Sequence, residues 1–306
     1  MTDATGAAFT EERARRVLAA AVPHLSEEGA GARLLALGEN AVFAVDRPGR
    51  PGLVVRISRD DDEAVWDRAV RELQVAEWLA AQGLPSVRPA SYSAEQPLPF
   101  GGHLVTYWEQ LPAAVRPAGP RDLAELLLLV HALPPAPVEL PGRDLLGGVE
   151  RWLRLAGDAI DPADAAFLRA RRDDFAAAAR ELTPHLPRGV IHGDALPRNV
   201  HVGPDGPVLV DLETFSTDLR EHDLVVMALS RDRYGLDPAG YDEFVAVYGW
   251  DVRDWEGCAV LRGARETASC AWVAQHAPGN PAALAEFRRR VGSLRDGDPA
   301  VRWYPF

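Results

Sequence analysis

Three short runs of strand-forming residues lie close together near the N-terminus of the chain. They span Arg33–Leu37, Ala41–Asp46 and Leu53–Ser58, and the turn-forming stretches Gly38–Asn40 and Pro48–Gly52 separate them. Parallel strands need a crossover of a dozen or more residues, whereas gaps this short suit tight turns. The spacing therefore predicts antiparallel hairpins and excludes βαβ units in this part of the chain.

Helical patterns flank this strand region. Phe9–Val22 is predicted to be helical, and a second helix runs from about Glu63 to Gln82 and stops at Gly83. Two further strands are predicted at Val87–Tyr92 and His103–Trp108. We therefore expect the first hundred residues to form a small sheet with helices.

From Gln110 the sequence becomes mostly helical. A connector rich in proline and alanine comes first, at Gln110–Pro120. The predicted helices that follow are Arg121–Ala132, Gly148–Asp158, Pro162–Leu182, Asp223–Ser230, Tyr241–Tyr248, Asp254–His276 and Pro281–Leu294. The prediction is an α+β fold with an antiparallel β-sheet N-lobe over residues 1–109 and a mostly helical C-lobe over residues 110–306.

The basic residues of this 306-residue chain are all arginine, since none of its 33 Lys+Arg residues is lysine. P-loop nucleotide hydrolases, Schiff-base enzymes and serine–lysine hydrolases are therefore excluded, because each depends on a lysine. The formal net charge of −12 argues against nucleic acid or an anionic membrane as the main partner. It is compatible with a cationic substrate.

Cysteine usage and hydropathy predict a soluble, cytoplasmic protein. Cys258 and Cys270 lie twelve residues apart in one predicted helix, which separates them by about 18 Å and prevents a disulfide. The polar stretch Met1–Glu12 has no apolar signal region, and the longest apolar run, Leu123–Leu133, is too short to span a bilayer. The sequence leaves the oligomeric state open.

One segment of the C-lobe carries the residues suited to catalysis. An apolar run ends in His192 and Asp194, Asn199 follows five residues later, and a second apolar run ends at Asp211. The turn Gly203–Gly206 between the two runs lets them pair as strands. We therefore expect Asp194, Asn199 and Asp211 at one edge of a hairpin.

This set of groups matches the needs of phosphoryl transfer. A carboxylate accepts the proton of the substrate hydroxyl, and an amide and a second carboxylate hold magnesium. Two alternatives are a metal site built on His192, His201 and His222, and a capped turn without chemistry. The histidine spacing fits no common zinc motif, so we favour catalysis, with His192 orienting the loop.

The segment resembles the aminoglycoside phosphotransferase family, in the choline-kinase-like branch of protein-kinase-like folds. That family carries His-Gly-Asp-x-x-x-x-Asn and then a strand ending in Asp-x-Asp or Asp-x-Glu, matched here by Asp194, Asn199, Asp211 and Glu213. The resemblance implies a bilobal protein-kinase-like fold and ATP or GTP as the nucleotide. It implies Asp194 as catalytic base, and Asn199, Asp211 and Glu213 as the residues of the Mg²⁺ site.

The resemblance extends into the N-lobe. Leu53–Ile57 is similar to the family's third strand, which implies that Arg56 contacts the nucleotide phosphates and pairs with Glu72, for which Glu77 is the competing candidate. The alternative for Arg56 is a surface charge on an edge strand. Further implied nucleotide-binding residues are Gly38 and Asn40 in a covering loop, and Tyr107 and Trp108 at the hinge.

Two charged features leave the acceptor open. From Gly189 to Asp223, seven acids stand against two arginines, a net charge of −5, which either attracts an amine-bearing antibiotic or is solvated surface. On the predicted helix Asp254–His276, four polar residues share one face that either lines the cleft or meets solvent. These residues are Arg262, Arg265, Glu266 and Ser269.

We therefore predict an enzyme that transfers the γ-phosphate of ATP or GTP to a hydroxyl of a small molecule with Mg²⁺. The acceptor is an aminoglycoside, another antibiotic, or a compound of biosynthesis or salvage. One alternative is a catalytically inactive kinase-like binding protein that serves a biosynthetic pathway as an accessory. Another is a metal-dependent hydrolase that uses Asp194, Asp211 and Glu213.

Overall fold

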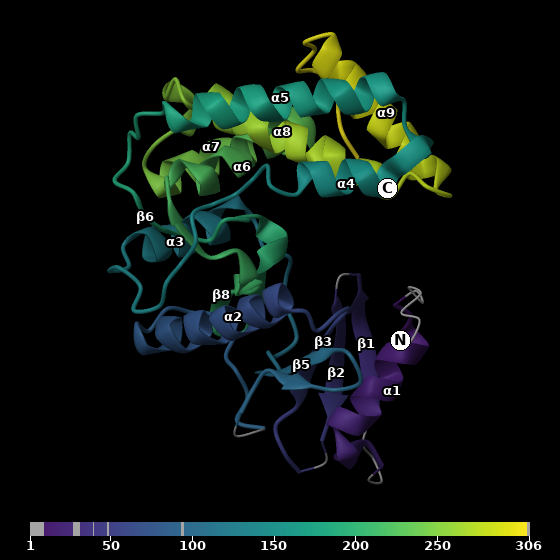
Figure 1. The fold of residues 1–306 in the computed structure, drawn as a ribbon. Coiled ribbons are helices and arrows are strands. Elements are labelled where there is room, and N and C mark those ends of the chain that lie inside the picture. Colours follow the sequence, from purple (N-terminus) through teal and green to yellow (C-terminus); the bar gives the residue numbers. More distant parts are fainter. Residues whose placement is uncertain (1–8, 27–30, 39, 48, 93–94, 305–306) are drawn as a thin grey trace. The chain divides into compact units, whose positions relative to one another are not determined.

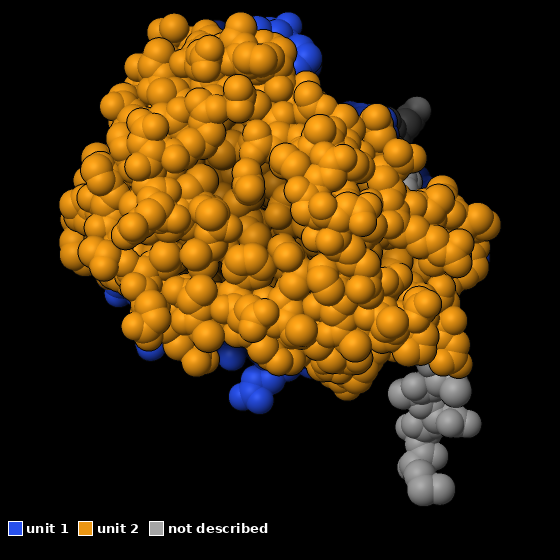
Figure 2. Space-filling view, turned by 90° about the horizontal axis from the view of Figure 1, so that it is seen from above, with its two compact units in different colours: residues 1–117, 137–139, 201–213 blue, residues 118–136, 140–200, 214–306 orange. Residues whose placement is uncertain are grey.

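The computed structural model of the chain describes residues 9–26, 31–38, 40–47, 49–92 and 95–304. Glu39 and Pro48 of the two predicted turns, and residues 1–8 of the polar N-terminal stretch, lie outside the described residues. The chain divides into two compact units, coloured separately in Figure 2. Unit 1 comprises residues 1–117, 137–139 and 201–213, and unit 2 comprises residues 118–136, 140–200 and 214–306.

Unit 1 is built on a five-stranded antiparallel sheet (Figure 1), with strand order β1-β2-β3-β5-β4. The strands are β1 Gly31–Leu37, β2 Asn40–Asp46, β3 Leu53–Ser58, β4 Leu98–Pro99 and β5 Leu104–Glu109. The hairpins predicted from the short turns are present. The predicted strand at Val87–Tyr92 is wrong, because this segment forms only isolated bridges at Ser86 and Pro89. Proline lacks the N–H that a continuous ladder needs.

Strand alternation gives this sheet an apolar face covered by α1, Glu11–Ala21. Phe43, Val55 and Ile57 are fully buried in the core on that face. Helix α1 begins after Thr10, whose side chain accepts a hydrogen bond from the backbone N–H of Arg13 at 3.3 Å.

Helix α2, Glu63–Ala81, also belongs to unit 1. The Asp62 side chain caps its first turn by accepting from the backbone N–H of Val65. Gly83 follows the helix with a φ of 74°, a left-handed conformation that glycine adopts without strain. The helix ends within one residue of the predicted boundary because this glycine stops it.

Unit 2 is mostly helical, and Figure 1 shows α8 lying beside α4, α5 and α9. Its α-helices are α3 Pro120–His131, α4 Val149–Ala156, α5 Pro162–Arg180, α6 Glu221–Arg233, α7 Pro238–Tyr248, α8 Cys258–Ala274 and α9 Pro281–Arg295. Helix α8 starts later than predicted because Val252–Asp254 forms a separate 3₁₀ turn capped by Asp251. Cys258 and Cys270 are free thiols buried among these helices. No helix within the described ranges is long and apolar enough to cross a membrane.

The strand pairing predicted around His192 and Asp211 is wrong. Strand β6, Gly189–Ile191, pairs antiparallel with β9, Ser216–Asp218. The turn after Gly203 joins β7, Val200–Gly203, to β8, Gly206–Leu209. A two-residue turn pairs only the strands that flank it directly, so β6 takes its partner from farther along the chain.

Candidate active site

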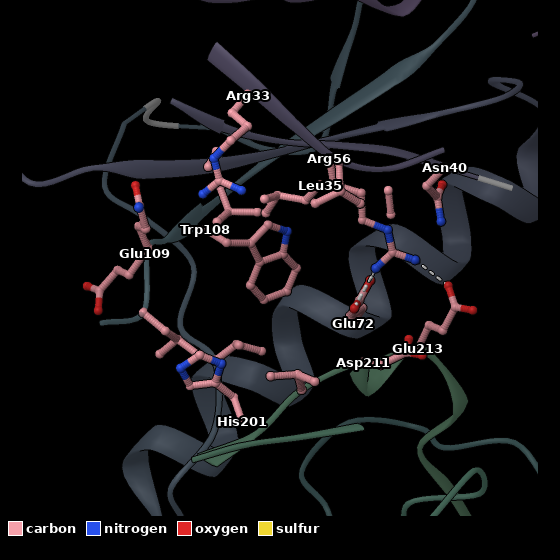
Figure 3. Close-up of a pocket in the computed structure, with 18 of the residues that line it drawn as sticks. Arg33, Leu35, Asn40, Arg56, Glu72, Trp108, Glu109, His201, Asp211 and Glu213 are labelled. Carbon is pink, nitrogen blue, oxygen red and sulfur yellow. Dashed lines mark hydrogen bonds and ion pairs between the residues drawn. The ribbon is translucent and has the colours of Figure 1, made fainter. Parts of the chain in front are cut away.

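The second face of the sheet in unit 1 lines a cavity of about 830 Å³. Asn40 and Val42 of β2 and Val54 and Arg56 of β3 point into it, since alternate residues of a strand face opposite sides. In Figure 3 the indole ring of Trp108 lies within the cavity. A cavity of this volume is in the range of small-molecule and cofactor sites.

A cluster of charged side chains holds Arg56 at the cavity wall (Figure 3). Its Nη1 donates to both carboxylate oxygens of Glu72 at 2.7 Å, and its Nη2 donates to Glu213. Asn40 places its amide oxygen toward the guanidinium of Arg56. This oxygen accepts hydrogen bonds from Nη2 and Nε of Arg56 at 2.9 and 3.0 Å. The expected ion pair between Arg56 and Glu72 is therefore present, while Glu77 is exposed.

Arg56 is not the surface charge of an edge strand. Its strand lies between β2 and β5, and its side chain is only 19% exposed. The Glu72 side chain is 6% exposed, so both charges are largely removed from water. A buried ion pair of this kind fixes the geometry of its arginine because the loss of either partner would leave the other as an uncompensated buried charge.

This cluster contains more acid than base. Burial, with a smaller contribution from Glu213 and Asp211, raises the pKa of Glu72 to about 7 against the opposing effect of Arg56. Burial acts to lower the pKa of Arg56, but the three carboxylates outweigh it and the pKa is raised. One arginine and three carboxylates sum to −2 when all are ionised, which one divalent cation would neutralise.

Asp211 has the backbone geometry of a specialised position. It is exposed, and its φ of 60° is the only positive value of a non-glycine residue in the described ranges. Such a conformation costs energy for residues with a side chain and is frequent at functional sites. Asp211 directly follows the β-hairpin of β7 and β8 and precedes Glu213 by two residues.

The His192-Gly193-Asp194 loop lies in unit 2, at the end of β6. Gly193 has a φ of 84°, and a Cβ atom there would lie 2.3 Å from the carbonyl oxygen of Thr214. Only glycine fits this position, since any side chain would meet rigid backbone. The hydroxyl of Thr214 in turn donates to the carbonyl oxygen of His192 at 2.8 Å.

A buried carboxylate that the sequence analysis missed holds this loop. Asp223 on α6 accepts from the backbone N–H groups of His192 and Gly193 at 2.8 Å each, and its Oδ2 lies 3.1 Å from Nε2 of His131. Burial acts to raise the pKa of Asp223, but His131 and the other donors outweigh it and the pKa is lowered. No pattern in the sequence distinguishes Asp223 from an ordinary acid at a helix N-terminus.

Asp194 is partly exposed and is held by arginine. Its side chain is 23% exposed, and Arg198 donates to its Oδ2 at 2.9 Å. Burial acts to raise the pKa of Asp194, but Arg265 and Arg198 outweigh it and the pKa is lowered. The carboxylate is therefore ionised at neutral pH and can accept a proton or a hydrogen bond from a hydroxyl.

Asn199 and His192 support Asp194 in different ways. The Nδ2 of Asn199 donates to the carbonyl oxygen of Asp194 at 2.8 Å, so its Oδ1 is the end of the amide that can bind a cation. His192 is fully buried, and its Nδ1 accepts from the backbone N–H of Asp194 at 3.3 Å. His192 thus orients the loop.

The structure brings the expected site residues together in two sets. His192, Asp194 and Asn199 lie in unit 2, whereas the remaining ones lie in unit 1. Those lining the cavity of unit 1 are Gly38, Asn40, Arg56, Glu72, Trp108, Asp211 and Glu213. Tyr107 does not line it: strand alternation turns its side chain to the opposite face, where its hydroxyl donates to the carbonyl oxygen of Ala21.

The alternative of a histidine metal site finds no support in the structure. The Nε2 of His201 lies 2.8 Å from the carbonyl oxygen of Pro112, and His222 is buried. Among the residues that the structure describes, no group of three or more His, Cys, Asp or Glu side chains is placed to hold a metal ion.

Comparison with known protein families decides the family. The phosphotransferase enzyme family matches residues 32–261, more than half of the chain. The chain belongs to this family. The prediction of a phosphotransferase with an alcohol group as acceptor is thereby confirmed, as is the α+β protein-kinase-like fold.

This family member shares its fold with solved kinases at low sequence identity. An amicoumacin kinase in complex with AMP-PNP and Ca²⁺ has a TM-score of 0.69 at 14% identity, covering 94% of each chain. The choline kinase of Streptococcus pneumoniae has a TM-score of 0.64 at 16% identity, covering 92% of this chain and 98% of that one. An aminoglycoside phosphotransferase, APH(4)-Ia, has a TM-score of 0.67 at 13% identity, covering 93% of this chain and 99% of that one. Comparison with the curated proteins finds no significant match.

Proposed function

We propose that this phosphotransferase moves the γ-phosphate of ATP to a hydroxyl of a small molecule with the help of Mg²⁺. The observation that carries the proposal is the buried Arg56–Glu72 pair at the wall of a nucleotide-sized cavity, with Asp211 and Glu213 beside it. The amicoumacin kinase of the same fold holds an ATP analogue and a divalent cation. These features support nucleotide binding in unit 1.

Each charged group then has a role in the reaction. Arg56 donates to the phosphate oxygens through its planar guanidinium, and Glu72 keeps it oriented. Asn199 and Asp211 would hold Mg²⁺, with Glu213 beside it, and the bound ion would neutralise the charge of the phosphates. The residues fit such an ion because their donors are carboxylate and amide oxygens, which Mg²⁺ prefers.

Asp194 acts on the acceptor. Its ionised carboxylate accepts a hydrogen bond from the acceptor hydroxyl and points the oxygen at the γ-phosphorus. As the new O–P bond forms, the bond from the γ-phosphorus to the bridging oxygen of ATP breaks, ADP leaves, and Asp194 takes up the hydroxyl proton. The buried Asp223 and the glycine at position 193 keep the loop in one conformation, so little reorganisation is needed during transfer.

Three further parts of the proposal concern the molecule as a whole. Residues 1–109 bind the nucleotide and residues 110–306 bind the acceptor and carry the catalytic base. The protein works in the cytoplasm. Either antibiotic resistance or a biosynthetic or salvage step is compatible with this chemistry, and GTP is the alternative nucleotide.

A thermal-shift titration with ATP and with GTP, each with and without Mg²⁺, tests the proposal. We expect the unfolding temperature to rise with one nucleotide only when Mg²⁺ is present, because a ligand that binds only the folded state stabilises it. The variant Asp211→Asn should lose most of that magnesium-dependent rise. No shift with either nucleotide would favour a kinase-like binding protein, and phosphate release that ignores every acceptor would favour a hydrolase.

A further inference from the structure

Two arginines from separate elements of unit 2 converge beside Asp194. Arg143, in the loop before α4, donates through Nε to the carbonyl oxygen of Gly193 at 2.9 Å. Arg265 of α8 donates through Nη2 to the same oxygen at 2.8 Å, and its Nη1 lies 3.5 Å from Oδ1 of Asp194. Two positive charges are thus held against one backbone atom, where they repel each other.

The protein itself only partly compensates this pair of charges. Burial lowers the pKa of Arg143, and the neighbouring Arg265 lowers it further. Asp194, the carboxylate closest to Arg265, is shared with Arg198. A guanidinium has five N–H donors, and Nε of Arg265 is buried without a partner within the described part of the chain. Hydrogen-bonding capacity and positive charge therefore remain beside the catalytic base.

The other acids of unit 2 in this region hold groups of the chain itself. Asp218 pairs with Arg188 at 2.9 Å and accepts from the backbone N–H of Arg143 at 2.8 Å, and Glu221 accepts from the backbone N–H groups of His185 and Leu186. Asp223 is fully buried and holds the catalytic loop. Apart from Asp194, the acids of unit 2 between Gly189 and Asp223 thus serve internal contacts, which argues against recognition of a polycationic acceptor in this unit.

The polar face of α8 is likewise not a simple solvated surface. Glu266 forms a buried ion pair with Arg233 at 2.7 Å, and Arg262 pairs with Asp232 at 2.8 Å. Arg265 alone among these charged residues of α8 reaches the His192-Gly193-Asp194 loop. Its side chain is 11% exposed, so its position is set by packing.

We propose that Arg143 and Arg265 bind a carboxylate of the acceptor, so that this enzyme phosphorylates a hydroxy acid rather than a polyamine. The inference rests on the proposed function, because it assigns the acceptor of that reaction. A carboxylate matches the planar donor fork of arginine. Two carboxylates, that of the acceptor and that of Asp194, would then balance the positive charges of Arg143, Arg198 and Arg265.

Compounds that share one skeleton but differ in charge test this inference. Glucuronate, glucose and glucosamine carry −1, 0 and +1 near neutral pH on the same ring, and glycerate, glycerol and 3-aminopropane-1,2-diol form a second set. Ligand-observed NMR without nucleotide measures binding to the protein. We expect the acid of at least one set to bind in preference to its neutral and cationic partners.

Variants of the arginines locate the binding. Arg265→Gln and Arg143→Gln should each weaken binding of the acid about tenfold, the effect of losing one charge-assisted contact. Arg265→Lys, which retains the charge, should recover part of the affinity. Arg121→Gln is the matched control, because Arg121 is 61% exposed on α3 of the same unit and pairs with Glu125 of the same helix; it should bind like the wild type.

Two readouts separate this inference from the proposed function. The magnesium-dependent thermal shift with ATP, measured on the same samples, reports the kinase proposal alone. The acceptor inference is wrong if that shift is intact but neither set of compounds shows preferred binding of its acid. It is also wrong if the shift is intact and the glutamine variants bind the acid as well as the wild type does. If the acid is favoured but no nucleotide shifts the protein, the proposed function is wrong while the anion site stands.

Discussion

Two carboxyl groups of this protein have opposite electrostatic surroundings. Glu72 shares one arginine with Glu213 and Asp211, and burial raises its pKa to about 7. Asp194 has Arg265, Arg198 and Arg143 around a single carboxylate, so its pKa is lowered although burial acts to raise it. The balance of nearby charges, rather than burial alone, decides which carboxyl is ionised.

The variant Asp194→Asn tests the catalytic base. An amide cannot accept the proton of the acceptor hydroxyl, so we expect the transfer rate to fall by about a hundredfold or more. Binding of the nucleotide with Mg²⁺ should remain, since Asp194 is not among the residues that line the cavity of unit 1. Steady-state kinetics and a thermal-shift titration measure the two properties. Transfer at the wild-type rate would refute the assignment.

The raised pKa of Glu72 predicts how stability depends on pH. Its folded-state pKa of about 7 lies above the ordinary value, so the folded protein binds this proton more tightly than the unfolded chain. The stabilisation is complete below the ordinary pKa and is lost as the pH rises through 7. Between pH 6 and 8, the wild type should lose about 1 kcal/mol more stability than Glu72→Gln, because one pKa unit is about 1.4 kcal/mol.

Urea denaturation of both proteins without nucleotide, at pH 6 and pH 8, measures this difference. Arg56→Gln provides a further comparison, since removing the positive charge should raise the pKa of Glu72 further and move the loss of stability to higher pH. Equal pH dependence in the wild type and Glu72→Gln would show that Glu72 is already ionised at pH 6.

At the scale of elements, the His192-Gly193-Asp194 loop depends on a glycine. Gly193→Ala places a Cβ atom 2.3 Å from the carbonyl oxygen of Thr214 at a φ of 84°. Gly249 after α7 has a φ of 92°, but a Cβ atom at this position would have no neighbouring atom within 4 Å. Gly249→Ala therefore isolates the cost of the backbone conformation.

We expect Gly249→Ala to cost about 1 kcal/mol of stability and to leave transfer intact. Gly193→Ala should cost at least about 1 kcal/mol more and abolish transfer, because Asp194 moves with the displaced loop. Urea denaturation and kinetics of both variants provide the comparison. Equal effects of the two substitutions would show that the contact with Thr214 is relieved without consequence.

The elements themselves were largely predictable from local patterns. β3 has the predicted bounds, and the ends of α2 follow from Asp62 and Gly83. Strand pairing was not predictable in the same way. β6 pairs with β9 across more than twenty residues, and no local signal selects such a partner over the nearer β8.

At the scale of the whole molecule, the absence of lysine allows a direct test of nucleotide binding. An acyl-phosphate derivative of ATP transfers its acyl group to an amine close to the bound phosphates, and this chain has no lysine to receive it. Arg56→Lys places a single amine on the wall of the cavity. We expect site-specific labelling of this variant that excess MgATP prevents, and no site-specific labelling of the wild type.

Arg121→Lys supplies the matched control, since its new amine stands on an exposed helix surface in unit 2. Mass spectrometry of the digested protein identifies the labelled residue. Labelling of both variants to the same extent would mean that the reagent reacts with any accessible amine. Labelling at position 121 alone would place the nucleotide away from the cavity.

The sequence alone determined which chemistries are possible and where most of the helices and strands lie. Missing lysine excluded several enzyme classes, and the His-Gly-Asp and Asp-x-Glu segments pointed to phosphoryl transfer, because residue types and short spacings are local properties of the chain. Only the tertiary structure decided that Asp223 holds the His192-Gly193-Asp194 loop, that Tyr107 turns away from the cavity, and that Arg143 and Arg265 donate to one oxygen beside Asp194. These hydrogen bonds join residues up to 86 positions apart, and packing of whole elements selects them rather than any neighbouring residue.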